Sequence, residues 1–157
     1  IRMELQLKPT DVAGLVGECV RIARPDAARR GLAIRAEVAD TAVAMADTGR
    51  IRQAVSELLS NAVKFAVEGT EVLAQCDRVD DEIRIRVSDE GPGMSEVEQH
   101  RAFDRFYRAP LAHRDAVQGF GLGLSVVHNI VTAHAGVASL ARSAAGGTEV
   151  TICIPAL

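Results

Sequence analysis

Residues 49–66 read GRIRQAVSELLSNAVKFA, and the spacing of their apolar side chains predicts a long amphipathic helix. A helix turns by about 100° per residue, so side chains three or four positions apart share a face. Asp47 or Thr48 supplies an oxygen that can cap the first turn. The apolar face, which we expect to pack on the core, consists of Ile51, Val55, Leu58, Leu59, Ala62 and Ala66.

The opposite face of this helix collects Glu57, Asn61 and Lys64. These side chains offer a carboxylate, an amide oxygen and an ammonium group, which together suit Mg²⁺ and phosphate oxygens. The same three residues also fit an ordinary solvated helix face. The helix alone does not decide between the two interpretations.

Outward from this helix, periodicity and turn residues predict two more helices and several strands. The helices are residues 11–29 and 122–133, and the strands are residues 32–38, 43–46, 71–78, 82–88, 137–142 and 149–154. Because helices and strands do not alternate strictly, their order indicates an α+β fold. We expect a two-layer α/β sandwich in which a mixed sheet of about five strands packs against three helices.

Composition narrows the classes of function. The 157 residues form one ordinary domain, 1–157, with a formal net charge of −3 and no basic run, which argues against nucleic-acid binding. Cys19, Cys76 and Cys153 are odd in number and widely spaced, so they indicate neither a disulfide framework nor a zinc site. No apolar run approaches the roughly 18 residues of a membrane span, so we expect no direct membrane contact by this domain.

The segment DEGPGM, residues 89–94, directly follows a predicted strand. Its glycines let the backbone turn sharply and admit a ligand close to Asp89. A buried carboxylate there could accept a hydrogen bond from the exocyclic amine of adenine, which guanine does not offer in the same place. The alternative is a simple turn from strand to loop.

The segment GFGLGL, residues 119–124, runs straight into a predicted helix. The exposed N–H groups at a helix start bind phosphate, so the segment suits a phosphate site, although a flexible hinge fits equally well. The dinucleotide fingerprint and the P-loop motif are both missing from the sequence. A third glycine segment, Gly146-Gly147-Thr148, is either a hairpin turn or a place where Thr148 reaches a base through water.

Between the first two glycine segments lies RAFDRFYR, residues 101–108, with three aromatic side chains in eight residues. It belongs to a long irregular stretch from Asp89 to Gly119, and loops of that length are usually functional or mobile. We interpret the aromatic residues as the anchor of a mobile lid. A small apolar cluster under the loop is the alternative.

Taken in order, the polar helix face, DEGPGM, RAFDRFYR, GFGLGLS and GGT resemble the N, G1, F, G2 and G3 boxes of sensor histidine kinases. The segments LKPTDVAGLV and VVHNIVTAHAG also look like that family, so the resemblance covers essentially the whole chain. It implies the Bergerat α/β sandwich with a mobile ATP lid. It also implies ATP and Mg²⁺ as cofactors and transfer of the γ-phosphoryl group to a histidine in two-component signal transduction.

Carried over by position, the resemblance implies that Asn61 ligates Mg²⁺. Glu57 is a second candidate metal contact on the residue types of the helix face, not on the resemblance. Lys64 becomes a phosphate contact and Asp89 the adenine-reading carboxylate. Arg108 matches the arginine that approaches the γ-phosphate. The other expected nucleotide contacts lie in the glycine segments: Gly91, Gly93, Met94, Gly119, Phe120, Gly121, Leu122, Gly123, Leu124 and Thr148.

One departure from the family pattern concerns Glu57, which stands where these kinases often have asparagine. It looks like the water-activating glutamate of the related hydrolytic ATPases. Our hypothesis is that Glu57 polarises a nucleophile, either the acceptor imidazole or water.

A second departure is that no histidine of the chain lies in the family's acceptor motif; we interpret His100, His113, His128 and His134 as surface or packing residues. The resemblance then implies an acceptor on a dimerisation domain outside this chain, and a response regulator receiver domain as the next partner. Residues 1–8 would be the end of the dimerisation helix or a linker. We expect a cytoplasmic domain of a homodimer whose parent protein could be membrane-anchored.

Three other functions fit the same motifs. They are a hydrolytic ATPase of the same fold, a serine kinase that holds a sigma factor, and a module that binds nucleotide only to signal. RAFDRFYR and the short lid favour the histidine kinase over the hydrolytic ATPase. Asn61, Asp89 and the glycines at 119–123 argue against a module without catalysis.

Overall fold

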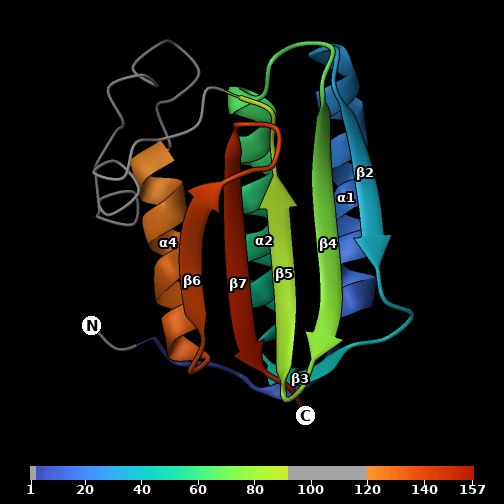
Figure 1. The fold of residues 1–157 in the computed structure, drawn as a ribbon. Helices are drawn as coiled ribbons and strands as arrows, with labels where there is room; N and C mark the ends of the chain where they lie inside the picture. Colours follow the sequence, from blue (N-terminus) through green and yellow to red (C-terminus); the bar gives the residue numbers. More distant parts are fainter. Residues whose placement is uncertain (1–2, 92–119) are drawn as a thin grey trace.

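The computed structural model describes residues 3–91 and 120–157. Within these residues the chain forms three helices and seven strands (Figure 1). In chain order they are β1 (Lys8–Asp11), α1 (Val12–Arg29), β2 (Ala33–Val38), β3 (Val43–Ala46), α2 (Thr48–Phe65), β4 (Glu71–Val79), β5 (Glu82–Ser88), α4 (Phe120–Ala133), β6 (Val137–Arg142) and β7 (Thr148–Pro155).

Five strands form the main sheet, in the order β2-β4-β5-β7-β6. The β2–β4 pair is parallel and the other pairs are antiparallel, so the sheet is mixed. The helices α1, α2 and α4 all lie on one face of this sheet (Figure 1). The predicted α+β fold, a two-layer sandwich of five strands and three helices, is confirmed.

The core lies between the sheet and the helices. In β5, Ile83, Ile85 and Val87 are buried, whereas the intervening Arg84 and Arg86 point to the opposite face, as strand alternation requires. Helix α2 lies behind β5 and buries the predicted apolar face, including Ile51, Val55 and Leu59. This double patterning, period two in strands and 3.6 in helices, is why one sheet face carries the core.

The predicted boundaries agree closely with the structure, and Asp47 is the cap of α2, because its carboxylate accepts a hydrogen bond from the Arg50 N–H at 3.1 Å. Helix α4 begins at Phe120, two residues before the predicted start at Leu122. The predicted strand 43–46 exists, but it pairs with β1 in a separate two-stranded sheet.

Strand β1 is missing from the sequence prediction. It has four residues, includes Pro9, and buries only Thr10, so it shows too little alternation to be recognised. Residues 3–7 form neither helix nor strand. The predicted lid and the aromatic segment 101–108 lie outside the described residues.

Among the described helices, none combines the length and the apolar character that crossing a lipid bilayer would require.

The turn after α4 depends on a close backbone approach at Gly136. A Cβ added there would lie 2.3 Å from the carbonyl oxygen of Cys153 on β7, so Gly136→Ala forces a backbone shift. We expect it to lower the free energy of unfolding by about 1–3 kcal/mol, measured by urea denaturation.

Gly17→Ala is the matched control, because a Cβ at that position in α1 meets nothing within 4 Å. The same change there should raise stability by up to about 1 kcal/mol, since alanine favours the helix. Equal effects of the two substitutions would contradict the packing described for Gly136.

Candidate functional site

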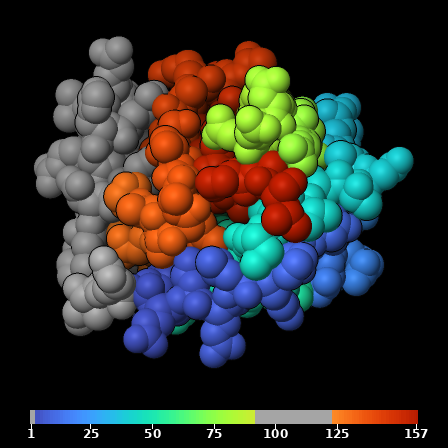
Figure 2. Space-filling model, turned by 90° about the horizontal axis from the view of Figure 1, so that it is seen from below, coloured from blue at the N-terminus to red at the C-terminus, as the bar shows by residue number. Residues whose placement is uncertain are grey.

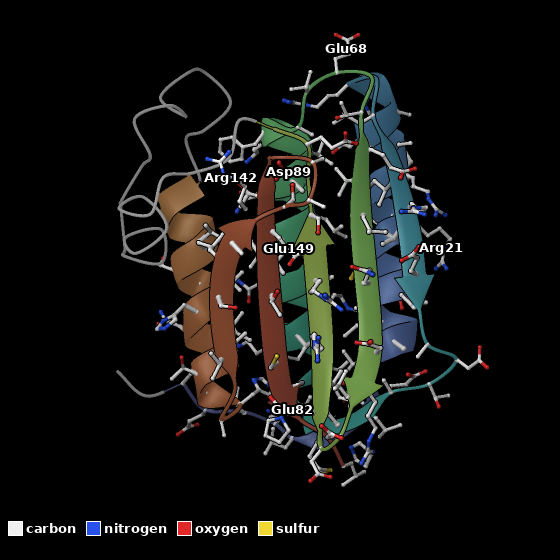
Figure 3. The ribbon with its side chains drawn as sticks, in the orientation of Figure 1. Arg21, Glu68, Glu82, Asp89, Arg142 and Glu149 are labelled. Carbon is white, nitrogen blue, oxygen red and sulfur yellow. The ribbon has the colours of Figure 1, made fainter. Side chains whose placement is uncertain are left out.

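Asp89 follows the last residue of β5 and is buried, with 6% of its surface exposed. Figure 3 shows it at the upper end of β5, beside the connection between β6 and β7. Its Oδ1 accepts hydrogen bonds from the Gly91 N–H at 2.8 Å and the Thr148 N–H at 3.2 Å. Both bonds come from backbone, so the carboxylate is fixed by the chain path rather than by a neighbouring charge.

The connection between β6 and β7 closes tightly on Asp89. The Ser143 hydroxyl donates to the Asp89 carbonyl oxygen at 2.8 Å and accepts from the Gly147 N–H at 2.8 Å. A Cβ on Gly147 would lie 2.1 Å from that same carbonyl oxygen. Residue 147 must therefore be glycine for this approach, and two glycine segments far apart in sequence meet at Asp89.

Burial raises the pKa of the Asp89 carboxyl above its usual range, because the charged form loses its hydration. The backbone N–H groups of Gly91 and Thr148 offset part of this effect. They both bind Oδ1, and no hydrogen bond within the described part of the chain is made to Oδ2. A ligand that donates a hydrogen bond to Oδ2 would favour the charged form.

A second cluster lies where α2 meets α4. A Cβ on Gly123 would lie 2.8 Å from Glu57 Oε2 and 3.3 Å from Asn61 Nδ2. The missing side chain at Gly123 thus lets both polar side chains of α2 approach the first turn of α4. The structure brings together Glu57 and Asn61, two of the three residues of the predicted polar helix face, and the last glycine of the segment 119–123.

Asn61 is 6% exposed, and its Nδ2 is buried with no partner among the described residues. The interpretation of a wholly solvated helix face is therefore wrong for Asn61, because α4 covers that side of α2. An unpaired buried amide donor costs free energy, so the Nδ2 of Asn61 is available to a partner that a bound ligand would supply.

Gly91 joins the two clusters. A Cβ there would lie 2.3 Å from the carbonyl oxygen of Phe65, the last residue of α2. The segment after Asp89 therefore runs directly against the end of the helix that carries Glu57 and Asn61.

Lys64, partly buried, lines a hollow of about 270 Å³ between α1 and α2.

Several predicted site residues occupy other positions or are not described. Leu124 is 1% exposed and its side chain belongs to the core, so the contact predicted for Leu124 stays a prediction for its backbone. Of Phe120, Gly121 and Leu122 only the helical backbone is described. The predicted contacts outside the described residues are Gly93, Met94, Arg108 and Gly119.

Sequence reasoning missed Ser143, whose hydroxyl ties the β6–β7 connection to Asp89. No sequence signal identifies it, since a serine before a turn is common. Its position only gains meaning from the pairing of β5 with β7, which brings Ser88 opposite Glu149.

The donors present fit a magnesium–nucleotide complex better than a protein-enclosed metal. In the described ranges, no group of three or more His, Cys, Asp or Glu side chains could hold a metal ion. Mg²⁺ usually takes one or two protein ligands and completes its shell with phosphate oxygens and water. Asn61 and Glu57 match that pattern.

Comparison with known proteins agrees with this geometry. Residues 46–157 match the family described as histidine kinase-, DNA gyrase B- and HSP90-like ATPases. The Escherichia coli histidine-protein kinase BaeS is 31% identical over 96% of this chain, and the E. coli sensor histidine kinase CusS is 33% identical over 95%. The chain spans about a third of either relative, 32% and 31% of their lengths.

Solved structures give the same result. The mycobacterial sensor histidine kinase MprB superimposes with a TM-score of 0.84 at 26% identity, covering 95% of this chain and 98% of that one. Full-length ShkA, solved in complex with AMPPNP, superimposes with a TM-score of 0.83 at 30% identity, over 99% of this chain and 32% of its own. The chain therefore belongs to the histidine kinase-, DNA gyrase B- and HSP90-like ATPase family, and within it to the ATP-binding catalytic domains of sensor histidine kinases.

Proposed function

We propose that this chain binds ATP with Mg²⁺ and donates the γ-phosphoryl group to a histidine on a dimerisation domain outside it. A response regulator receiver domain would take the phosphoryl group next. The observation that carries the proposal is the buried Asp89 carboxylate with one oxygen unused by the described chain. Family membership and the AMPPNP complex of the similar kinase ShkA support it.

The base end of the nucleotide would lie at Asp89. Oδ2 can accept a hydrogen bond from the exocyclic amine of adenine, whereas guanine carries an oxygen there and would face the carboxylate with like charge density. Thr148, whose backbone already binds Asp89, stands beside it and can contact the base through water. The family resemblance would add Gly91, Gly93 and Met94 to the same end of the proposed site.

The phosphate end would lie at the start of α4. Its first N–H groups are free of helical partners and favour anions, so Gly119, Gly121 and Gly123 would line the phosphates, with Lys64 and Arg108 as cationic contacts. Asn61 and Glu57 would hold Mg²⁺. When bound, the metal would neutralise phosphate charge. The residues of the chain would hold the nucleotide in position for the transfer.

The acceptor would be elsewhere. Of the histidines that the structure describes, His134 is buried and engaged by both ring nitrogens, and His128 lies on the exposed side of α4. Neither lies against Asp89, Asn61 or Glu57 in the contacts described. His100 and His113 lie outside the described residues. The proposal places the acceptor histidine on a second domain, which fits the greater length of the relatives.

Glu57 favours a second candidate function, ATP hydrolysis. Its carboxylate lies against the first turn of α4, close to the position of Gly123. A carboxylate at the phosphate end can polarise either of two nucleophiles, a water molecule or the imidazole of an acceptor histidine. The same residue would then serve either reaction, and the nucleophile present would decide between them.

The base-recognition step predicts a preference for adenine. We expect ATP and ADP to bind at least about tenfold more tightly than GTP, since a hydrogen bond to a buried charge is worth roughly 1.5–3 kcal/mol. Asp89→Asn should remove most of that preference in isothermal titration with Mg²⁺. Glu149→Gln, the same change on a nearby carboxylate of β7, should keep it; equal binding of ATP and GTP by the unaltered chain would refute the assignment.

Asp89→Asn should also stabilise the folded chain at pH 7. Asparagine keeps an oxygen for the Gly91 and Thr148 N–H groups but buries no charge. The pKa of Asp89 is raised in the folded state, so the unaltered chain regains stability as pH falls through that pKa. The difference in free energy of unfolding between the two proteins should therefore shrink on acidification. It should vanish below the usual pKa range of aspartate.

Urea unfolding of both proteins across that pH range measures the difference, and titration of all other groups cancels in it. A substitution that lowers stability at pH 7, or a difference that does not change with pH, would show that Asp89 is not a buried charge maintained for a ligand.

Glu57→Ala tests the role as a base. We expect phosphotransfer to a supplied phosphoacceptor domain, or ATP hydrolysis, to fall about a hundredfold. Glu57→Gln, which keeps the shape, should behave alike, and Glu82→Gln at the opposite end of the sheet is the control (Figure 3). Unchanged rates of both reactions would end the hypothesis.

A further inference from the structure

Asp47 caps the start of α2 and forms a junction there, at the end of the helix far from the proposed site. Its Oδ1 accepts from the Arg50 N–H at 3.1 Å, and its Oδ2 accepts from the Gln6 N–H at 3.0 Å. Its own backbone N–H donates to His134 Nε2 at 3.0 Å. One residue therefore links the segment before β1, the first turn of α2 and the end of α4. Figure 2 shows this end of the molecule, where the N-terminal segment, β3 and α4 gather.

His134 is buried, and both of its ring nitrogens are engaged. Nδ1 lies 2.7 Å from the carbonyl oxygen of Ile130, and Nε2 lies 3.0 Å from the Asp47 nitrogen. A carbonyl only accepts and a backbone N–H only donates, so Nδ1 carries the hydrogen and Nε2 does not. The contacts therefore require the neutral imidazole with hydrogen on Nδ1.

The junction and the proposed site lie at opposite ends of the same helix pair. At one end Asp47 and His134 join the start of α2 to the end of α4. At the other, Gly123 of α4 faces Glu57 and Asn61 of α2. Asn61 lies fourteen positions after Asp47, which is about 20 Å at the helical rise of about 1.5 Å per residue.

The fit at Gly123 is sensitive to sliding of the two helices. A Cβ there would already lie 2.8 Å from Glu57 Oε2, so a shift of α4 along α2 changes which backbone groups meet the site. We propose that His134 is a positioning residue for the nucleotide site. Its hydrogen bond to the Asp47 amide fixes the register of α4 on α2. This inference rests on the proposed function.

Two substitutions separate the hydrogen bonds of His134. Glutamine places its amide near the position of Nε2 and can still accept from the Asp47 N–H. Asparagine reaches only the position of Nδ1 and cannot. We expect His134→Asn to weaken binding of ATP with Mg²⁺ about fivefold, the worth of one hydrogen bond, and His134→Gln to bind like the unaltered chain. Thr132→Asn, on the exposed side of the same helical turn, is the control.

Titration calorimetry at a temperature where all variants are folded gives the affinities. Equal losses in His134→Gln and His134→Asn, or no loss in either, would overturn the inference. Failure of the unaltered chain to bind ATP would instead refute the proposed function. Should His134→Asn not fold, nitrogen chemical shifts of His134 in the unaltered chain still decide: hydrogen on Nε2 would contradict the junction, and hydrogen on Nδ1 supports it.

Discussion

Helix α2 is packed on two sides, and the geometry of the proposed site follows from that. Its apolar side chains face the sheet, and α4 lies against the side that carries Glu57 and Asn61. Its last carbonyl group, at Phe65, meets the turn after Asp89. Both clusters of the site therefore lie against α2. Because a helix is rigid, the positions of these contacts along α2 fix the distance between the base end and the phosphate end.

Two features of this packing oppose stability. Asp89 is a carboxylate buried without a cationic partner among the described residues, and the Nδ2 of Asn61 has no hydrogen-bond partner there. A core selected only for stability would replace both by apolar groups. Both lie near the C-terminal end of α2, which is best explained by a ligand that supplies a donor at one point and polar oxygens at the other.

The sequence predicts the elements well because each has a clear period. The alternation in β5 and the apolar face of α2 determine which side of each element is buried, and the structure confirms both. The strand β1 escapes prediction, since four mostly exposed residues around Pro9 have no period. The burial of Asn61 also escapes it, because the polar face of a helix shows no sign of a second helix that will cover it.

The site was predictable only as an ordered set of weak motifs. Each glycine segment fits an ordinary turn, and the residue spacing within it does not distinguish that turn from a ligand site. What distinguishes them is space: Gly147 and Gly123 stand where any side chain would strike the Asp89 carbonyl group or the Glu57 carboxylate. That information depends on the pairing of β5 with β7 and on the contact of α2 with α4, between segments separated by dozens of residues. Local sequence determines which residues could serve a nucleotide, and the strand order determines which of them meet.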